Sequence, residues 1–278
     1  MKSMSKVFSA KMFFLDLYKQ LKSIIIWFVI AVLIVLCAGA LFYTLETSGV
    51  PDLMREMMTA LPEELLNAVD LNMLPDFSEH NAVFGIMCQW ILVLTTIYAG
   101  YLGAAAIVRF SCDGSINFLI AQPISRAALV ITRYFSQFVS VILYNALLYV
   151  ILVIYGNVIG VSGVASLALS VSGVFLLVEF LCYSIGFLIS NALHTLSSAA
   201  SFGFGFFIFT FAVACICRLM PHLEFGLYLC PYEYFNVYSM CVGGYEFPVI
   251  TAILTAVVSL AFFAGSAVIF IQTDIKDH

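Results

Sequence analysis

The chain has 278 residues, of which 63% are hydrophobic and only 10% are charged, and its net charge is −5. Soluble domains carry about 25% charged residues, and a chain this short cannot hide so much apolar side chain in one aqueous core. A mean hydropathy of +1.09 therefore excludes an ordinary soluble protein, and the acidic balance without a basic patch excludes a nucleic-acid binder.

Six segments are long and apolar enough to cross about 30 Å of hydrocarbon as helices. They cover residues 24–45, 83–108, 134–158, 164–190, 198–220 and 249–271. The sequence thus predicts an all-α polytopic membrane protein with one transmembrane domain over residues 1–278. Glycines between the third and fourth segments predict a tight turn there.

Positive charge is unevenly distributed between the two sides of these predicted spans. Only Arg55 and Arg218 fall on one side, whereas the other Lys and Arg lie before the first span, between the second and third, and after the sixth. Because cytoplasmic segments are enriched in Lys and Arg, both termini are predicted to be cytoplasmic. An odd number of spans would split the basic residues between the two sides.

Two segments outside the spans have helical patterns. Residues 7–22 are typical of an amphipathic elbow helix at the membrane surface, although a simple positive flank that fixes topology explains the same lysines. The segment 47–81 is the longest polar stretch, and Pro62 followed by carboxylates suits a helix start. We expect short helices in this extracytoplasmic loop.

The cytoplasmic segment between the second and third spans has a distinct pattern. A turn at 113–115 precedes an apolar face made of Ile116, Leu119 and Ile120, and Pro123 ends that run. Ser125 then begins the helix that leads into the third span. A short surface helix of this kind could dock a cytoplasmic partner.

Four segments in this order resemble the permease subunits of type-2 ABC exporters. They are Asp113-Gly114-Ser115-Ile116-Asn117-Phe118-Leu119-Ile120-Ala121-Gln122-Pro123-Ile124-Ser125-Arg126, Leu61-Pro62-Glu63-Glu64-Leu65-Leu66, Cys230-Pro231-Tyr232-Glu233-Tyr234-Phe235-Asn236, and Phe270-Ile271-Gln272-Thr273-Asp274-Ile275. The resemblance covers nearly the whole chain. Ser115 stands where the family has Thr, and Asp113 alone represents the family's acidic cluster.

The resemblance implies a membrane subunit of the plasma membrane whose ATP is bound and hydrolysed by a separate ABC ATPase, beside a second permease chain that is identical or paralogous. It implies a coupling helix over 111–122 and a second contact over 191–197. The ATPase-coupling residues would be Asp113, Gly114, Ser115, Ile116, Phe118, Leu119, Pro123 and Arg126. No G-x-x-x-x-G-K-[ST] motif occurs in the chain, so we expect no enzyme activity and no cofactor in this subunit.

Glu179 lies in the middle of the fourth predicted span, where an ionisable side chain is costly. It is therefore expected to face the bundle or a wet cavity, either as a transport-path residue or as a hydrogen-bonded structural acid. The small residues Ala99, Gly100, Gly103 and Ala104 predict close helix packing, within one bundle or between two chains. The four His have no paired spacing, so we expect no metal site.

Two further questions are left open by the sequence. Cys230 and Cys241 share a polar loop and could form a disulfide, although free thiols are favoured.

The leading functional prediction is an ATP-driven exporter of an amphipathic or hydrophobic cargo, such as a peptide, drug or lipid-like compound. The alternative is a secondary transporter or channel, which would need internal repeats and broken helices lined with ionisable groups.

Overall fold

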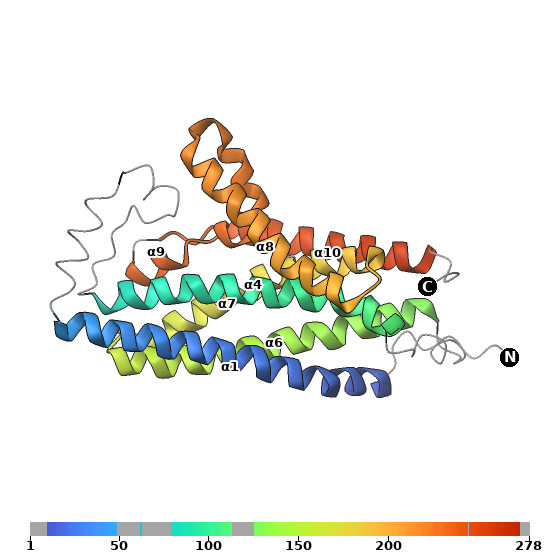
Figure 1. The fold of residues 1–278 in the computed structure, drawn as a ribbon, viewed down its shortest axis with the longest axis horizontal. Coiled ribbons are helices and arrows are strands. Elements are labelled where there is room, and N and C mark those ends of the chain that lie inside the picture. Colours follow the sequence, from blue (N-terminus) through green and yellow to red (C-terminus); the bar gives the residue numbers. More distant parts are fainter. Residues whose placement is uncertain (1–9, 49–61, 63–78, 113–124, 244, 273–278) are drawn as a thin grey trace.

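The computed structural model describes residues 10–48, 62, 79–112, 125–243 and 245–272 (Figure 1). Its long helices are α1 (Ala10–Ser48), α4 (His80–Cys112), α6 (Arg126–Ile159), α7 (Val164–Ile189), α8 (Leu196–Leu219) and α10 (Val249–Gln272). Its short elements are η1 (Ser190–Ala192), η2 (Pro221–Leu229), η3 (Pro231–Glu233) and α9 (Val237–Val242). Six helices are long and apolar enough to cross a membrane, which confirms the predicted all-α class with six spans.

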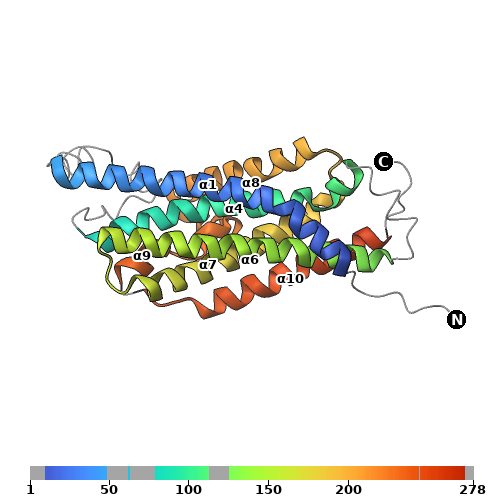
Figure 2. The same cartoon turned by 90° about the horizontal axis from the view of Figure 1, so that it is seen from below.

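Helix α4 lies at the centre of the bundle and is its most buried spanning helix. It packs against α7 on one side and α8 on another, while α1 packs along α6 and α10 along α7 (Figures 1 and 2). The outer helices α1, α8 and α10 leave many large apolar side chains exposed. This distribution suits a bundle in lipid, where apolar residues need no burial inside the protein.

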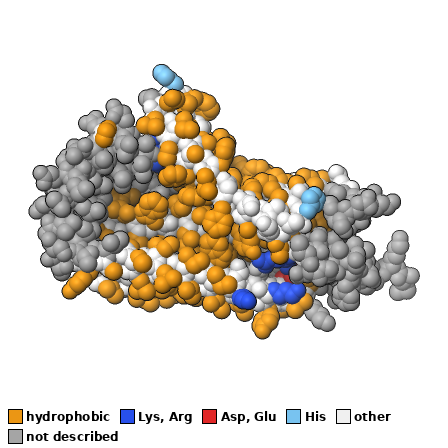
Figure 3. Space-filling view, viewed as in Figure 1, with side chains coloured by type: hydrophobic (Ala, Val, Ile, Leu, Met, Phe, Trp, Pro, Cys, Tyr) orange, Lys and Arg blue, Asp and Glu red, His pale blue; other side chains and the backbone are white. Residues whose placement is uncertain are grey.

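The helix ends divide between two ends of the bundle. Helices α1, α6 and α8 begin at the same end at which α4, α7 and α10 finish, on the right of Figure 1. We call this the basic end, because Lys19, Lys22, Arg109 and Arg133 belong to the turns of α1, α4 and α6 nearest to it. On the face shown in Figure 3, basic side chains gather beside α1 near this end. Which end faces the cytoplasm stays a prediction.

Local sequence explains where the helices stop and start. The Ser125 side chain caps α6 by accepting a hydrogen bond from the Ala128 N–H at 3.2 Å. The α6–α7 turn uses Gly160 and Gly163, whose φ angles of 82° and 62° lie in the left-handed region that glycine tolerates best. The Thr195 and Ser198 side chains form a capping box that begins α8.

Helix α1 is longer than the span predicted for it. Residues 10–22, the described part of the predicted elbow, continue into the first span as one helix. No proline occurs in α1 and its single glycine is Gly39, so nothing in residues 10–38 breaks the helix. Phe14, Leu15 and Tyr18 are nevertheless exposed on this part, as an amphipathic surface would require. Almost all of the predicted 47–81 loop lies outside the described residues.

Helix α8 and η2 form a hairpin that projects from the bundle (Figure 1). An ion pair between Arg218 and Glu233, 2.6 Å apart, ties the end of α8 to η3 below the hairpin. Cys230 follows η2, and its thiol lies 3.0 Å from the Thr210 carbonyl oxygen of α8. Burial, together with the nearby Glu233 carboxylate, raises the pKa of the Cys230 thiol to about 11.

The two cysteines of the polar loop are not bonded to each other. Cys230 and Cys241 are both free and buried, in agreement with the favoured prediction of free thiols. Cys241 of α9 packs instead against α4, where its Cβ would lie 3.0 Å from a Cβ added to Gly85. The two sulfur atoms thus serve different contacts, one with α8 and one with α4.

Candidate functional site

A buried polar cluster lies inside the bundle, between α4, α6 and α7. It consists of Thr95, Tyr98, Tyr144, Asn145 and Glu179, and we call it the carboxyl cluster. The Asn145 amide donates a hydrogen bond to Glu179 Oε2 at 3.1 Å. Glu179 itself is fully buried, which confirms that it faces the interior of the bundle. Its role as a transport-path residue stays a prediction.

The carboxyl cluster is incompletely hydrogen-bonded within the described residues. Glu179 Oε1 and the hydroxyl groups of Tyr98 and Tyr144 have no partner among them. The two tyrosine rings lie 4.6 Å apart, and Trp27 of α1 covers Tyr98 with ring centroids 5.5 Å apart. In surroundings of low polarity such groups are costly without partners. The cluster therefore holds unused hydrogen-bonding capacity behind an aromatic cover.

A second polar cluster joins three helices near the basic end. Asp16 and Gln20 of α1 meet Arg109 of α4 and Arg133 of α6, and we call these four residues the ionic clamp. The Arg133 guanidinium pairs with the Asp16 carboxylate at 2.5 Å and donates from Nε to the Ala106 carbonyl oxygen at 3.1 Å. Asp16 and Arg133 are about 5% and 4% exposed, so this is a buried ion pair.

Arg109 completes the ionic clamp through neutral groups. Its guanidinium donates to Gln20 Oε1 at 2.8 Å and to the Tyr101 hydroxyl at 3.4 Å. The Tyr101 ring also lies under the guanidinium, 5.9 Å from its centroid. The clamp thus ties α1 to the end of α4 and to the beginning of α6, the two helices that flank residues 113–125.

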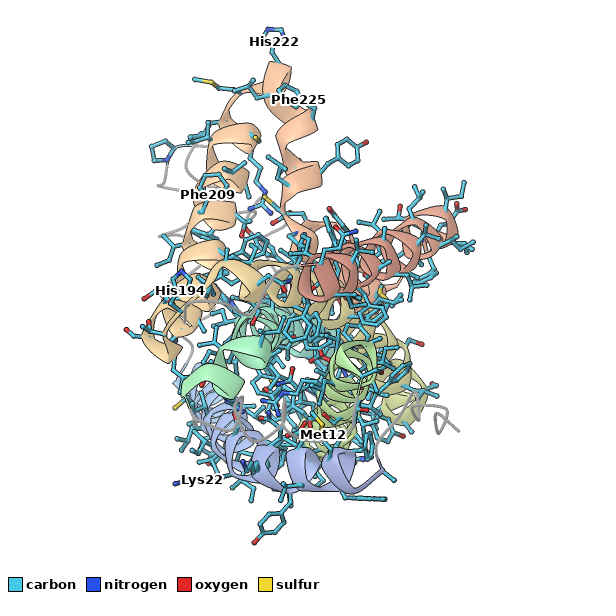
Figure 4. The ribbon with its side chains drawn as sticks, turned by 90° about the vertical axis from the view of Figure 1, so that its right-hand side faces the viewer. Met12, Lys22, His194, Phe209, His222 and Phe225 are labelled. Atoms are coloured by element: carbon cyan, nitrogen blue, oxygen red, sulfur yellow. The ribbon has the colours of Figure 1, made fainter. Side chains whose placement is uncertain are left out.

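The predicted coupling residues are placed only in part. All but one of them lie outside the described residues, namely Asp113, Gly114, Ser115, Ile116, Phe118, Leu119 and Pro123. Arg126 is the first residue of α6. The predicted second contact, residues 191–197, forms η1 and the turn into α8 at the basic end, and its His194 is exposed (Figure 4).

Sequence reasoning missed the ionic clamp. The charge pattern predicts Arg109 and Arg133 to be loop residues that set topology, but both lie within helices, and Arg133 is buried. A signal was present, because Asp16 and Gln20 are polar residues four positions apart and so share one face of a helix. Among the described residues, no group of three His, Cys, Asp or Glu side chains is placed to hold a metal ion.

The six spanning helices and their buried polar clusters define a polytopic α-helical membrane protein. The sequence profile described as "ABC-2 family transporter protein" matches residues 12–274. The chain therefore belongs to the ABC-2 transporter family and is a permease subunit of an ABC transporter. A search of curated proteins and a search of solved structures each gave no match.

Proposed function

We propose that this chain forms the translocation path of an ATP-driven exporter and is coupled to a separate ATPase subunit. Family membership supports this proposal most directly. ATP would be bound by the partner, since the chain has no phosphate-binding Gly-Lys motif of its own. In this proposal the basic end faces the cytoplasm of the cell in which the protein spans the plasma membrane, with both termini on that side.

The connection between α4 and α6 is the proposed contact site for the ATPase subunit. The helices on either side of it, α4 and α6, finish and begin at the basic end, where the ionic clamp fixes both to α1. A push on this connection would therefore act on three helices at once, and a packed bundle responds to such a push by moving between discrete states. The exposed turn before α8 lies at the same end and is the proposed second contact.

Mutation of the predicted coupling helix provides the main test. Ile116→Asp and Leu119→Asp each place a charge on its apolar face, and each is expected to reduce ATPase recovery with the tagged chain, and transport, by at least about tenfold. Asn117→Asp adds the same charge on another face and serves as the matched control. The measurement is nucleotide-dependent ATPase activity copurified from native membranes, alongside cargo efflux.

Two results would count against the ATPase-coupled proposal. One is a tagged chain, intact and folded, that brings down no ATP-hydrolysing subunit. The other is transport that survives without ATP but collapses with an ion gradient, as a secondary transporter would behave.

A second permease chain, identical or paralogous, is the proposed neighbour in the membrane. The projecting hairpin of α8 and η2 supports this, because Phe209, Phe225 and Tyr228 on it are 60%, 68% and 79% exposed (Figure 4). The cargo is proposed to be amphipathic or hydrophobic, such as a peptide, drug or lipid-like compound. The aromatic interior and the scarcity of charge in the spans support that class over a free ion.

Glu179 is the proposed path residue. Glu179→Gln keeps the size of the side chain and an oxygen that can accept from Asn145, so the melting temperature is expected to change little. Transport is expected to fall about tenfold if an acidic group is required at this depth. Ser172→Ala, a buried polar change two turns away on α7, is the control and should leave transport intact. Unchanged transport in Glu179→Gln would assign Glu179 a structural role only.

A further inference from the structure

A groove of about 420 Å³ opens between α1, α4 and α8 near the basic end. Its lining has two chemically different parts. One part is basic and includes Lys19 and Lys22 of α1 and Arg109 of α4; the other is aromatic and includes Trp27 and Phe204. In the view from the basic end, Lys22 lies at the outer edge of the bundle (Figure 4). The groove therefore offers positive charge beside an apolar surface.

The described lining of the groove contains no carboxylate beside Lys22 and Arg109. Arg109 is held by the neutral Gln20 amide and the neutral Tyr101 hydroxyl and ring. Asp16, one turn away from Gln20 on α1, is already paired with Arg133. An anion entering the groove would therefore meet a guanidinium that neutral groups hold in place.

Gln20, which accepts a hydrogen bond from Arg109, also has an unused hydrogen-bond donor of its own. Its side chain is fully buried, and its Nε2 group has no acceptor among the described residues, although its Oε1 atom accepts from Arg109. A buried amide donor without an acceptor is uncommon in a folded protein. Within the described residues, Gln20 Nε2 is thus an unused buried donor on the residue that holds Arg109, and Asp16 Oδ2, one turn away on α1, is an unused buried acceptor.

The apolar part of the groove continues from this charge toward the middle of the bundle. Trp27 packs between Tyr98 and Phe204, with ring centroids 5.5 and 6.5 Å away. Phe204 is 52% exposed, so about half of its side chain lies on the outer surface of the bundle. Lys19 and Ile26 are two helical turns apart, which corresponds to about 10 Å along α1. That distance separates the headgroup region of a lipid from the upper part of its acyl chains.

We propose that this groove binds an anionic phospholipid. Lys19, Lys22 and Arg109 hold its phosphate through charge-assisted hydrogen bonds, and an acyl chain lies on Trp27 and Phe204. A zwitterionic lipid carries its own cation, which offsets the attraction of the three basic groups. A free phosphate gains the charge contacts but leaves the aromatic surface uncovered. The site is independent of the proposed transport function, because it requires neither cargo nor ATPase.

Tryptophan fluorescence tests this proposal directly. The chain has two tryptophans, Trp27 in the groove and Trp90 on α4, so Trp90→Phe makes Trp27 the sole reporter. The full-length Trp90→Phe protein is placed in vesicles that contain either brominated phosphatidylglycerol or brominated phosphatidylcholine at equal mole fraction. Quenching of Trp27 is expected to show a preference for the anionic lipid on the order of tenfold.

Variants at the two lysines assign that preference to the groove. Lys19→Gln with Lys22→Gln is expected to lower the preference to near one, whereas Lys19→Arg with Lys22→Arg keeps the charge and should keep the preference. Equal quenching by the two lipids in the parent protein would overturn the proposal, whether or not the variants fold. The proposal would also be overturned if the preference for the anionic lipid persisted in the Lys19→Gln, Lys22→Gln variant. The same holds if inorganic phosphate in millimolar excess abolished that preference.

Discussion

Replacing Asp16 by Leu, or Arg133 by Met, is expected to destabilise the protein by roughly 3–5 kcal/mol. Each change removes one partner of an ion pair that is almost completely buried and leaves the other charge uncompensated. The double variant should be more stable than either single variant, because it removes both buried charges together. Melting temperatures of the purified protein in lipid nanodiscs provide the measurement.

Lys22→Leu is the matched control for this experiment. It removes a charge from the same helix, but the lysine side chain is exposed and lies outside the ionic clamp. The nanodiscs contain only zwitterionic lipid, so the proposed anionic-lipid site does not contribute to the comparison. Its effect on stability should stay within about 0.5 kcal/mol. If the double variant were less stable than both single variants, the pair would not be the reason for the loss, and the side chains would matter through other contacts.

A methyl group at Gly103 or Gly186 is expected to force α4 and α7 apart. A Cβ at Gly103 would collide with the Tyr183 carbonyl oxygen, and one at Gly186 would collide with the Gly100 carbonyl oxygen. Backbone atoms cannot rotate away as a flexible side chain can, so each Gly→Ala change should cost about 1–3 kcal/mol or more. The same two helices hold Thr95, Tyr98 and Glu179, so transport should fall as well.

Two other glycines test whether the close contact is the cause. No atom lies within 4 Å of a Cβ added to Gly173 of α7 or Gly205 of α8. Alanine has a higher helix propensity than glycine by up to about 1 kcal/mol, so Gly173→Ala and Gly205→Ala should be neutral or stabilising. Opposite effects of Gly173→Ala and Gly186→Ala on one helix would confirm the tight α4–α7 contact. Equal effects would contradict it.

The sequence predicted the helices of this protein better than their ends. Hydropathy places a span where side chains are apolar, but a helix continues as long as no residue interrupts it. This is why α1 begins at Ala10, well before the predicted span that starts at residue 24. The start of α6 at Arg126, capped by Ser125, agrees instead with the helix start predicted at Ser125. The small residues of the second span also met expectation, since Gly100 and Gly103 approach α7 within the same chain.

The sequence predicted the position of a polar side chain only where one residue alone was enough for the inference. Glu179 had to face the interior, because exposure of a carboxyl group to hydrocarbon is costly. The ionic clamp depends instead on Asp16 and Arg133, which are separated by 117 positions. Each residue alone has an ordinary local explanation as part of a polar or positive flank. Their pairing follows from the packing of α1 against α6, which periodicity does not encode.

The uninterrupted course of α1 has a mechanical consequence. Its 39 residues make a continuous helix that measures about 58 Å along its axis, nearly twice the thickness of the hydrocarbon layer. One end of this helix is fixed by the ionic clamp to the helices that flank residues 113–125, while most of its surface lies outside the core. A tilt imposed at the clamped end would therefore reappear at Ser48 as a lateral displacement, so α1 would act as a lever that links the two sides of the membrane.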